Sequence, residues 1–278
     1  MKNSHTVSRT LLLLVTSCIA GCASWPGLED PSLTVAPKIS LYRVHGTTQM
    51  QHNNVAQAAQ KVQDLGAGTR DEELAGRLSY GDGFSGFDLD YLVLSMESTE
   101  PGQAKQGWGT IRQGETVNSS MDMDEVRLRY IAMLPWGYSD EDNEIWFKTG
   151  AGFQLTHREL SFTVTETNGT GGTNNSQKIE VKDDLSPMLA VRIAGGRGPL
   201  DMQIDYAING DWGLGTGNLN NWFFDFAVQA NYYLEAQDLT LFGGYRRFDI
   251  RAKGSEGSSQ YRTDFTLDGL FFGFRFIF

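Results

Sequence analysis

Only three histidines besides His5 are available for acid–base chemistry, and one of them has candidate partners nearby in the sequence. His157 is followed at alternate positions by Glu159 and Ser161, and a base, an acid and a hydroxyl are the groups that activate a nucleophile in hydrolases. On one strand, however, His157 and Ser161 would lie about 13 Å apart, which is too far for direct proton transfer. The spacing therefore favours a polar strand end over an active site.

The sequence carries none of the spacings that hold a metal or a phosphate group. It has no HExxH, no paired CxxC and no two histidines at close ligand spacing, so we expect no zinc site. Gly169, Gly171 and Gly172 stand among Asn and Thr without a following Lys-Ser or Lys-Thr, which indicates a loop rather than a phosphate cradle. We expect no cofactor.

The elements that position the polar side chains are strands, because the dominant hydrophobic period is two. In Val126–Trp136 the apolar residues fall on even positions, and charged residues occupy the odd positions around its start. Leu200–Trp212 and Trp222–Leu234 alternate in the same way. Alternation over ten or more residues is typical of strands with two different faces.

Strands of this length suit a tilted crossing of a bilayer, which takes about 9–11 residues. We predict eight, and long and short connections alternate between them, as in barrels with loops outside and tight turns in the periplasm. The predicted strands are roughly 86–97, 123–136, 143–164, 186–195, 200–212, 221–234, 238–252 and 264–278. The long connections are 98–122, 165–185, 213–220 and 253–263, and the short ones are 137–142, 196–199 and 235–237.

A count of ten strands is the alternative. Asp82-Gly83 is a tight-turn signal, so Leu74–Gly83 could form one more strand before the first hairpin. Lys38–Val44 would supply the tenth. Both additions keep the number even and the orientation unchanged.

Composition excludes several other classes of protein. The 278 residues are 40% hydrophobic and 21% charged, with 32 Gly and 7 Pro, which is unlike disordered, collagen-like or coiled-coil chains. No apolar run reaches the roughly 18 residues of a spanning helix. The 23 basic and 34 acidic residues give a net charge of −11, which argues against nucleic acid as a partner.

The first residues have the pattern of an export signal. Lys2 and Arg9 make a basic start, Leu11–Val15 an apolar centre, and small residues follow. The end, Ile19–Cys22, reads Ile-Ala-Gly-Cys and is similar to the lipobox of bacterial lipoproteins.

That resemblance implies that residues 1–21 are a lipoprotein signal peptide, cut off by the lipoprotein-processing machinery. Cys22 would carry the acyl chains (palmitate among them), and two or three chains anchor a protein stably. The mature chain would have 21 basic and 34 acidic residues, a net charge of −13, and no disulfide. Ala23 in place of Asp favours the outer membrane. An ordinary secretory signal, cut near Ala20 or Ala23, is the alternative.

Residues 22–73 differ from the rest and are expected to form a lipidated periplasmic tether. Asn53–Leu65 predicts one short helix, with Val55, Ala58 and Val62 on its apolar side. The glycines that follow would end it. The tether could hang below the barrel or plug it.

The last residues carry the clearest resemblance to a family. The chain ends on Phe, with aromatic residues at alternating positions before it, and this looks like the terminal-strand signal that the barrel-assembly machinery recognises. The residues of this signal are Phe272, Phe274, Phe276 and Phe278. With the export signal and the strand count, the chain resembles small eight-stranded outer-membrane barrels of the OmpA/OmpX kind. A soluble sandwich or lipocalin with a Phe end is the alternative.

The resemblance implies an all-β, antiparallel, up-and-down transmembrane barrel over 74–278, surrounded by outer-membrane lipid and lipopolysaccharide. The strand positions opposite the apolar face would then line the lumen, and they carry seven acidic and seven basic residues. These are Asp88, Asp90, Glu125, Asp201, Asp205, Asp211 and Asp225, and Arg127, Arg129, Lys148, Arg158, Arg192, Arg246 and Arg275. A small barrel has little room inside, so we expect them to pair and close the lumen.

The expected function is that of a non-enzymatic outer-membrane β-barrel lipoprotein with a structural, adhesion or envelope-interaction role. One alternative is a small-solute channel, although no ring of single-sign charge is visible. The other is a lipid A-modifying enzyme, because some outer-membrane lipid A deacylases use a lipid-facing histidine, serine and acid. Their His-x-Ser pattern is absent around His157.

Overall fold

The computed structural model describes residues 31–53, 57–68, 71–140, 144–167, 175–209 and 222–278. The described chain is almost entirely strand, with two short 3-10 helices, η1 (Val62–Leu65) and η2 (Glu235–Gln237). No helix in these ranges is long and apolar enough to cross a membrane.

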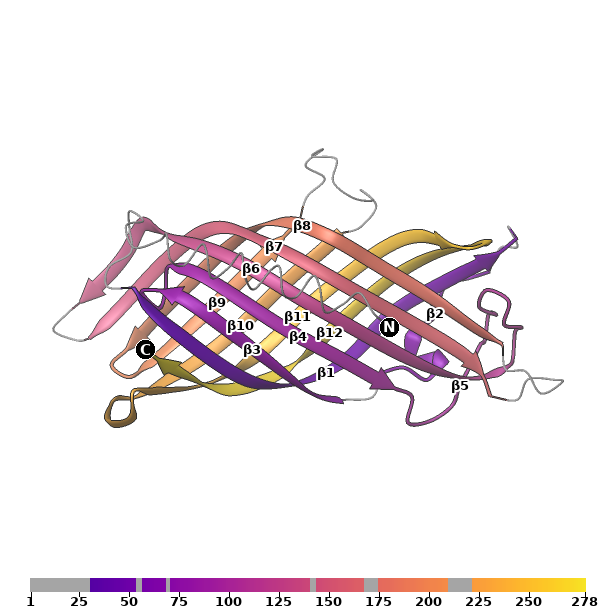
Figure 1. The fold of residues 1–278 in the computed structure, drawn as a ribbon, viewed down its shortest axis with the longest axis horizontal. Coiled ribbons are helices and arrows are strands. Elements are labelled where there is room, and N and C mark those ends of the chain that lie inside the picture. Colours follow the sequence, from indigo (N-terminus) through magenta and orange to yellow (C-terminus); the bar gives the residue numbers. More distant parts are fainter. Residues whose placement is uncertain (1–30, 54–56, 69–70, 141–143, 168–174, 210–221) are drawn as a thin grey trace.

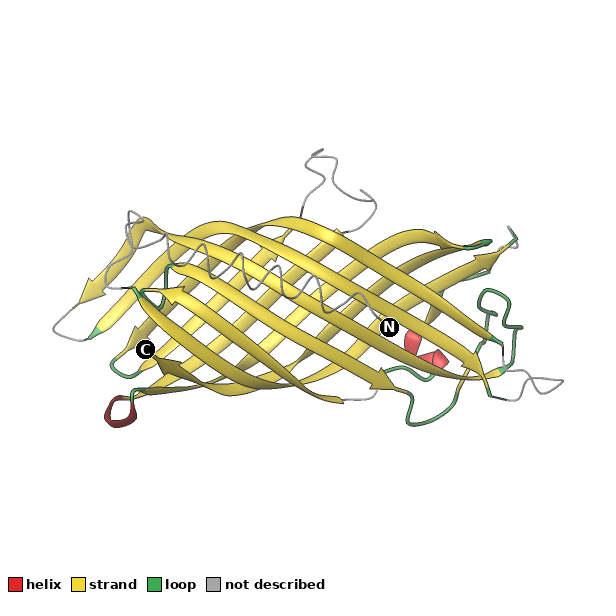
Figure 2. Cartoon of the chain, viewed as in Figure 1, coloured by secondary structure: helices red, strands yellow, loops and turns green. Residues whose placement is uncertain are grey.

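Ten long antiparallel strands form a closed ring (Figures 1 and 2). Each strand pairs with its sequence neighbours, and the first pairs with the last. The long strands are β1 (Ser32–His52), β3 (Asp71–Gly81), β4 (Gly86–Glu97), β6 (Thr116–Asp140), β7 (Ile145–Glu166), β8 (Ser176–Arg197), β9 (Leu200–Ile208), β10 (Trp222–Leu234), β11 (Leu239–Glu256) and β12 (Ser259–Ile277). Two strands of two residues, β2 (Gln60–Lys61) and β5 (Gly102–Gln103), pair with β1 and β6.

The prediction of eight strands is wrong, and the alternative of ten matches the long strands. The extra two are β1 and β3, which begin the ring. The turn predicted at Asp82-Gly83 is confirmed: Asp82 Oδ1 accepts hydrogen bonds from the backbone amides of Phe84 and Ser85, 2.9 and 2.6 Å away. β1 then closes the ring by pairing with β12 from Thr34 to His52.

The predicted extent of the tether, residues 22–73, is wrong, because the strands of the ring begin at Ser32 rather than at residue 74. The helix predicted over Asn53–Leu65 is wrong within the described residues, where only η1 is helical. The apolar residues of η1, Val62 and Leu65, are fully buried in the barrel interior instead of forming one face of a longer helix. The glycine predicted to end it does so: Gly66 closes η1 at φ 89°.

Several strands are longer than predicted, so the loops between them are shorter. β11 and β12 meet in a tight turn at Gly257 and Ser258, where a loop over 253–263 was expected. β7 and β8 extend into the predicted loop 165–185. The predicted loop 213–220 lies outside the described residues.

The two ends of the ring differ. Leu33 and Phe278 exchange backbone hydrogen bonds at one end, on the left in Figure 1, which we call the terminal end. The opposite, distal end carries β5, η1 and the segment 98–115 (Figure 1).

The wall inverts its polarity about half way along several of the long strands. On β6 the outward residues from Val126 to Leu134 are apolar, and the outward residues from Thr116 to Asp124 are polar. The inward residues change in the opposite sense at the same level, from Met123 to Glu125. The outward apolar residues of the terminal half form a continuous band, which we call the apolar belt.

The faces of neighbouring strands change polarity at the same level of the wall. The outward residues of β7 pass from Leu155 to His157, and those of β12 from Leu270 to Asp268. Inward positions pass from Asp90 to Leu92 on β4. The terminal half is thus apolar outside and charged inside, whereas the distal half is polar outside and apolar inside.

The distal half is filled by one hydrophobic core. Inward side chains of the strands pack with Trp108, which is fully buried and makes an edge-to-face contact with Phe162 at 5.7 Å between ring centroids. We call the segment 98–115 that carries Trp108 the distal cap. Phe162 continues the contact to Phe265 on the far wall, 5.5 Å away. The distal interior is therefore solid.

Candidate functional site: the charged interior

The centre of the terminal half is a cluster of buried ion pairs. Arg246 donates through Nη2 to Glu125 Oε1 at 2.6 Å and through Nε to Asp225 Oδ1 at 2.9 Å. Arg127 pairs with the other oxygen of Asp225, and Arg158 pairs with the other oxygen of Glu125. Each of the two carboxylates is therefore held by two guanidinium groups, and hydrogen bonds between ionised groups are stronger than those between neutral ones.

A second cluster lies beside the first one. Arg192 donates to Asp205 at 2.7 Å and to Asp88 at 2.6 Å. Arg129 pairs with Asp205 at 2.7 Å and approaches Asp225 at 3.7 Å, which joins the two clusters. The two clusters together draw on inward positions of β4 and of β6 to β11.

Two members of the network, Lys38 and Arg77, were not predicted from the sequence. Lys38 Nζ lies 2.8 Å and Arg77 Nε 3.0 Å from Asp90 Oδ1, while Arg127 Nη2 lies 3.1 Å from Asp90 Oδ2. Both cations belong to β1 and β3, the strands that the count of eight left out. The alternation of Ala75, Arg77 and Ser79 would have indicated Arg77 in a ten-strand reading.

Aromatic rings close the network toward the distal half. Arg158 lies 4.9 Å from the Phe223 ring and 5.5 Å from the Phe248 ring, and Arg246 lies 4.7 Å from the latter. Burying each charge costs several kcal/mol of desolvation, which only close pairing offsets. The paired charges and the rings above them leave this level of the barrel filled.

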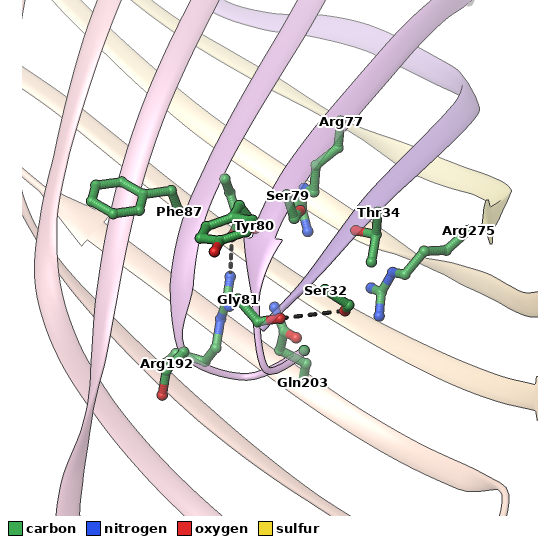
Figure 3. Close-up of a pocket in the computed structure, with 13 residues that line it drawn as sticks. Ser32, Thr34, Arg77, Ser79, Tyr80, Gly81, Phe87, Arg192, Gln203 and Arg275 are labelled. Atoms are coloured by element: carbon green, nitrogen blue, oxygen red, sulfur yellow. Dashed lines mark hydrogen bonds and ion pairs between the residues drawn. The ribbon is translucent and has the colours of Figure 1, made fainter. Parts of the chain in front are cut away.

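At the terminal end the network opens into a cavity of about 430 Å³, which we call the vestibule. Lys148 and Arg275 line it together with Asp201, Gln203 and Trp146. Asp201 Oδ1 accepts a hydrogen bond from Asn231 Nδ2. A smaller cavity of about 20 Å³ adjoins it and shares Arg275 and Gln203. Figure 3 shows Arg77, Arg192 and Arg275 around this smaller cavity.

Four predicted positions lie outside the ion-paired clusters or outside the described residues. Lys148 and Arg275 lie in the vestibule rather than in the ion-paired clusters, and among the described residues neither makes a salt bridge. Asp211 and the lipidation candidate Cys22 lie outside the described residues.

The candidate catalytic residues lie on the outer wall, just beyond the apolar belt. His157 Nε2 lies 4.0 Å from Glu159 Oε1, and Ser161 is four residues further along β7, opposite Asp122. Partial burial, and then the nearby Glu159, raise the pKa of Asp124 on β6. This is a polar strand surface with like charges. Ser161 lies four residues along the same strand from His157, which is too far for His157 to act as its base.

The terminal aromatic residues lie on the outer face of β12. The predicted Phe272, Phe274 and Phe276 are between 41% and 49% exposed and belong to the apolar belt. Phe278 is 75% exposed, and its backbone amide donates to the Leu33 carbonyl at 2.9 Å.

Over the described ranges no three His, Cys, Asp or Glu side chains are grouped so that they could hold a metal ion. The acidic side chains of the interior are instead surrounded by arginines. A cationic shell of this kind does not suit a cation ligand set.

Comparisons with known proteins give outer-membrane β-barrels as the similar solved structures. The outer membrane protease OmpT from Escherichia coli has 9% identity over 89% of this chain and 97% of its own, at a TM-score of 0.35. The P. putida toluene transporter TodX has 11% identity over 90% and 91%, at 0.31. The NalP translocator domain from Neisseria meningitidis has 11% identity over 97% of both chains, at 0.26. No family model and no curated protein matches the sequence. At these scores the likenesses assign no activity.

Proposed function

We propose that this protein is an integral outer-membrane β-barrel lipoprotein with a closed lumen, a non-enzymatic structural scaffold that presents its distal end for adhesion or envelope interaction. In this arrangement the apolar belt meets lipid, and the terminal end faces the periplasm with Cys22 anchored beside it. The distal half projects beyond the lipopolysaccharide. The barrel-assembly and lipoprotein-processing machineries would handle its maturation.

The polarity inversion carries this proposal. On β6 the outward run from Val126 to Leu134 is apolar over nine residues, close to the length of a tilted transmembrane strand. The belt leaves large side chains exposed on every side, such as Leu189, Met202 and Leu270, each about half exposed. A soluble protein rarely exposes a continuous apolar band of this size.

The filled interior supports a scaffold rather than a channel. Two barriers stand in series: the ion-paired clusters of the terminal half and the hydrophobic core under the distal cap. Opening a path would require separating Arg246 from two buried carboxylates and also displacing Trp108. Each step is costly because it exposes groups that are now paired or packed.

Conductance tests the closed lumen. The full acylated protein, reconstituted in planar bilayers, is expected to give no unitary current steps, with an open porin as the positive control. A variant in which a short Gly-Ser linker replaces the distal cap, 98–115, is expected to stay silent too, because the ion-paired clusters remain. Reproducible unitary steps from the unmodified protein would overturn the proposal in favour of a small-solute channel.

Metabolic labelling tests the lipid anchor. Cells grown with labelled palmitate are expected to incorporate label into the unmodified chain and not into Cys22→Ser. Cys18→Ser is the matched control, because residue 18 would be removed with the signal peptide. Equal labelling of both variants would contradict the assignment of Cys22.

Mass spectrometry of lipid A tests the non-enzymatic role. Expression of the unmodified protein and of His157→Ala is expected to leave the same lipid A species, since His157 and Ser161 do not form a catalytic pair. Loss of an acyl chain with the unmodified protein, but not with the variant, would support the lipid A-modifying alternative.

A further inference from the structure

The positive charge of the barrel interior exceeds its negative charge, although the whole chain is acidic. At inward strand positions of the terminal half, the described residues include nine cations and six acids. The cations are Lys38, Arg77, Arg127, Arg129, Lys148, Arg158, Arg192, Arg246 and Arg275, and the acids are Asp88, Asp90, Glu125, Asp201, Asp205 and Asp225. The excess stays positive when Glu73 is added, whose carboxylate accepts from the Ser95 backbone amide at the β3–β4 seam.

Two of these cations stand apart from the ion-paired clusters, in the vestibule. Seven of the nine cations make salt bridges, and the two that make none within the described chain, Lys148 and Arg275, both line this cavity. The Lys148 ammonium lies 5.9 Å from the centroids of both the Phe84 and the Trp146 ring. The ammonium group is thus held near the faces of two aromatic rings that line the same cavity.

The two acids of the vestibule, Asp82 and Asp201, keep their charge, but within the described chain neither forms a salt bridge with Lys148 or Arg275. Asp82 Oδ1 accepts two backbone amides of its own turn, and the Asp201 carboxylate accepts from Asn231. The amides of Gln203 and Asn231 also line the cavity, and they add neutral polar groups. A cavity with two unpaired cations, side-chain amides and an aromatic wall is suited to an anion that has an organic body.

We propose that the vestibule is a binding site for a small organic anion, whose carboxylate or phosphate group would lie between Lys148 and Arg275. The cavity of about 430 Å³ is large enough for a metabolite-sized molecule, whereas the adjoining cavity of about 20 Å³ holds no more than a water. Only the compartment from which the anion would enter, the periplasm, rests on the proposed function.

Calorimetric titration of the full protein in a non-ionic detergent tests the site. Citrate and inorganic phosphate are the probes for the two anionic groups, and glucose is the neutral control. We expect at least one of the two anions to bind and glucose not to bind. Lys148→Met and Arg275→Met are each expected to weaken anion binding about tenfold, as the loss of a partly buried charge pair does. Arg247→Met, a cation on the outer distal wall, is the matched control and should leave the affinity unchanged.

A variant that binds the anion more tightly shows that the effects of substitution do not come from misfolding. Asp201→Asn removes a negative charge from the vestibule wall and leaves the shape of the side chain nearly unchanged, so it is expected to tighten anion binding several-fold. Failure of both anions to bind, or equal binding by Lys148→Met, Arg275→Met and the unmodified protein, would overturn the proposal. Because the conductance and labelling tests do not involve these residues, failure here leaves the scaffold proposal standing.

Discussion

Arg246 shows how single residues hold the interior together. Its guanidinium bridges Glu125 and Asp225, and it lies against the Phe248 ring. All of these groups are buried, so removing one partner leaves charges that neither water nor another protein group can neutralise. A buried pair broken on one side is much more damaging than a surface pair broken in the same way.

Arg246→Met is therefore expected to lower the free energy of unfolding by about 3–5 kcal/mol, because two buried carboxylates each lose a partner. Arg247→Met is the matched control. Arg247 follows Arg246 in the sequence, but its side chain points outward, is 47% exposed and pairs with Asp249, so its loss should cost less than about 1 kcal/mol. Urea unfolding in detergent micelles measures both. Similar losses in the two variants would contradict the buried network as a source of stability.

The raised pKa of Asp124 predicts that the stability gained by replacing it depends on pH. Partial burial first, and then Glu159 and Asp122, raise the pKa of this carboxyl, so the folded protein binds the proton more tightly than the unfolded chain does. A raised acid pKa costs stability as pH rises through its folded value, and the cost is absent below the unfolded value. Asp124→Asn should thus stabilise the protein at pH 7 and not at pH 3. The gain should stay near 0.5 kcal/mol, since the side chain is exposed and screened.

Unfolding curves of Asp124→Asn and of the unmodified chain, recorded at the two pH values, check this. An equal gain at both pH values would mean that the benefit does not come from removing the ionised form.

At the residue scale, strand alternation alone predicts which charged side chains point inward. Glu125, Arg127 and Arg129 are separated by two positions each, and all three are buried. Alternation cannot predict their partners, because pairing depends on how strands far apart in sequence lie across the barrel. Lys38 shows the same limit: its strand was left out of the count of eight, and its partner Asp90 is 52 positions away, on a strand that is not its neighbour.

At the element scale, the strands with strong alternation were predicted well and the first strands were not. β4 begins and ends at the predicted residues, Gly86 and Glu97. β1 passes through Ala36, Pro37 and Ser40, small residues that weaken the contrast between its two faces. The barrel accepts them because β1 is held by hydrogen bonds to β3 and β12, which no local pattern reports.

The longest strands were underestimated because their polarity inverts. In β6 the apolar residues change from the outer to the inner face between Val126 and Met123. A search for one continuous apolar face ends at that point. The distal continuation to Thr116 then looks like part of a polar loop.

Substitution of Gly46 tests the close packing between β1 and β12, the first and last strands of the ring. It adopts φ 120°, and a Cβ at this position would lie 1.9 Å from the Asp264 carbonyl oxygen of β12. Gly46→Ala is expected to destabilise the barrel by about 2 kcal/mol, because the backbone must move or remain strained. Gly76→Ala is the control, since a Cβ there meets nothing within 4 Å. The shift in the temperature at which the folded, fast-migrating form disappears on gels measures the effect, and equal shifts would contradict the close approach.

At the scale of the whole molecule, the inversion predicts which surface meets lipid. Leu128→Cys lies within the apolar belt, and Asp122→Cys lies on the same face of β6 beyond it. In liposomes Asp122→Cys is expected to react with a charged maleimide, and Leu128→Cys is expected to stay unmodified. In detergent-free unfolded protein both should react. Rapid modification of Leu128→Cys in liposomes would argue against the bilayer position of the belt.

The pairing of the first and last long strands also has a consequence for the order of assembly. Arg43 and Asp268 pair across that seam although they are 225 positions apart in the chain. Loop closure over such a distance is slow, and until it happens both edges of the growing sheet expose unpaired peptide groups. A chain that lacks its last strand would therefore have two open edges and be prone to aggregate. A chaperone that covers an unpaired edge would thus matter more for this protein than one that speeds local folding.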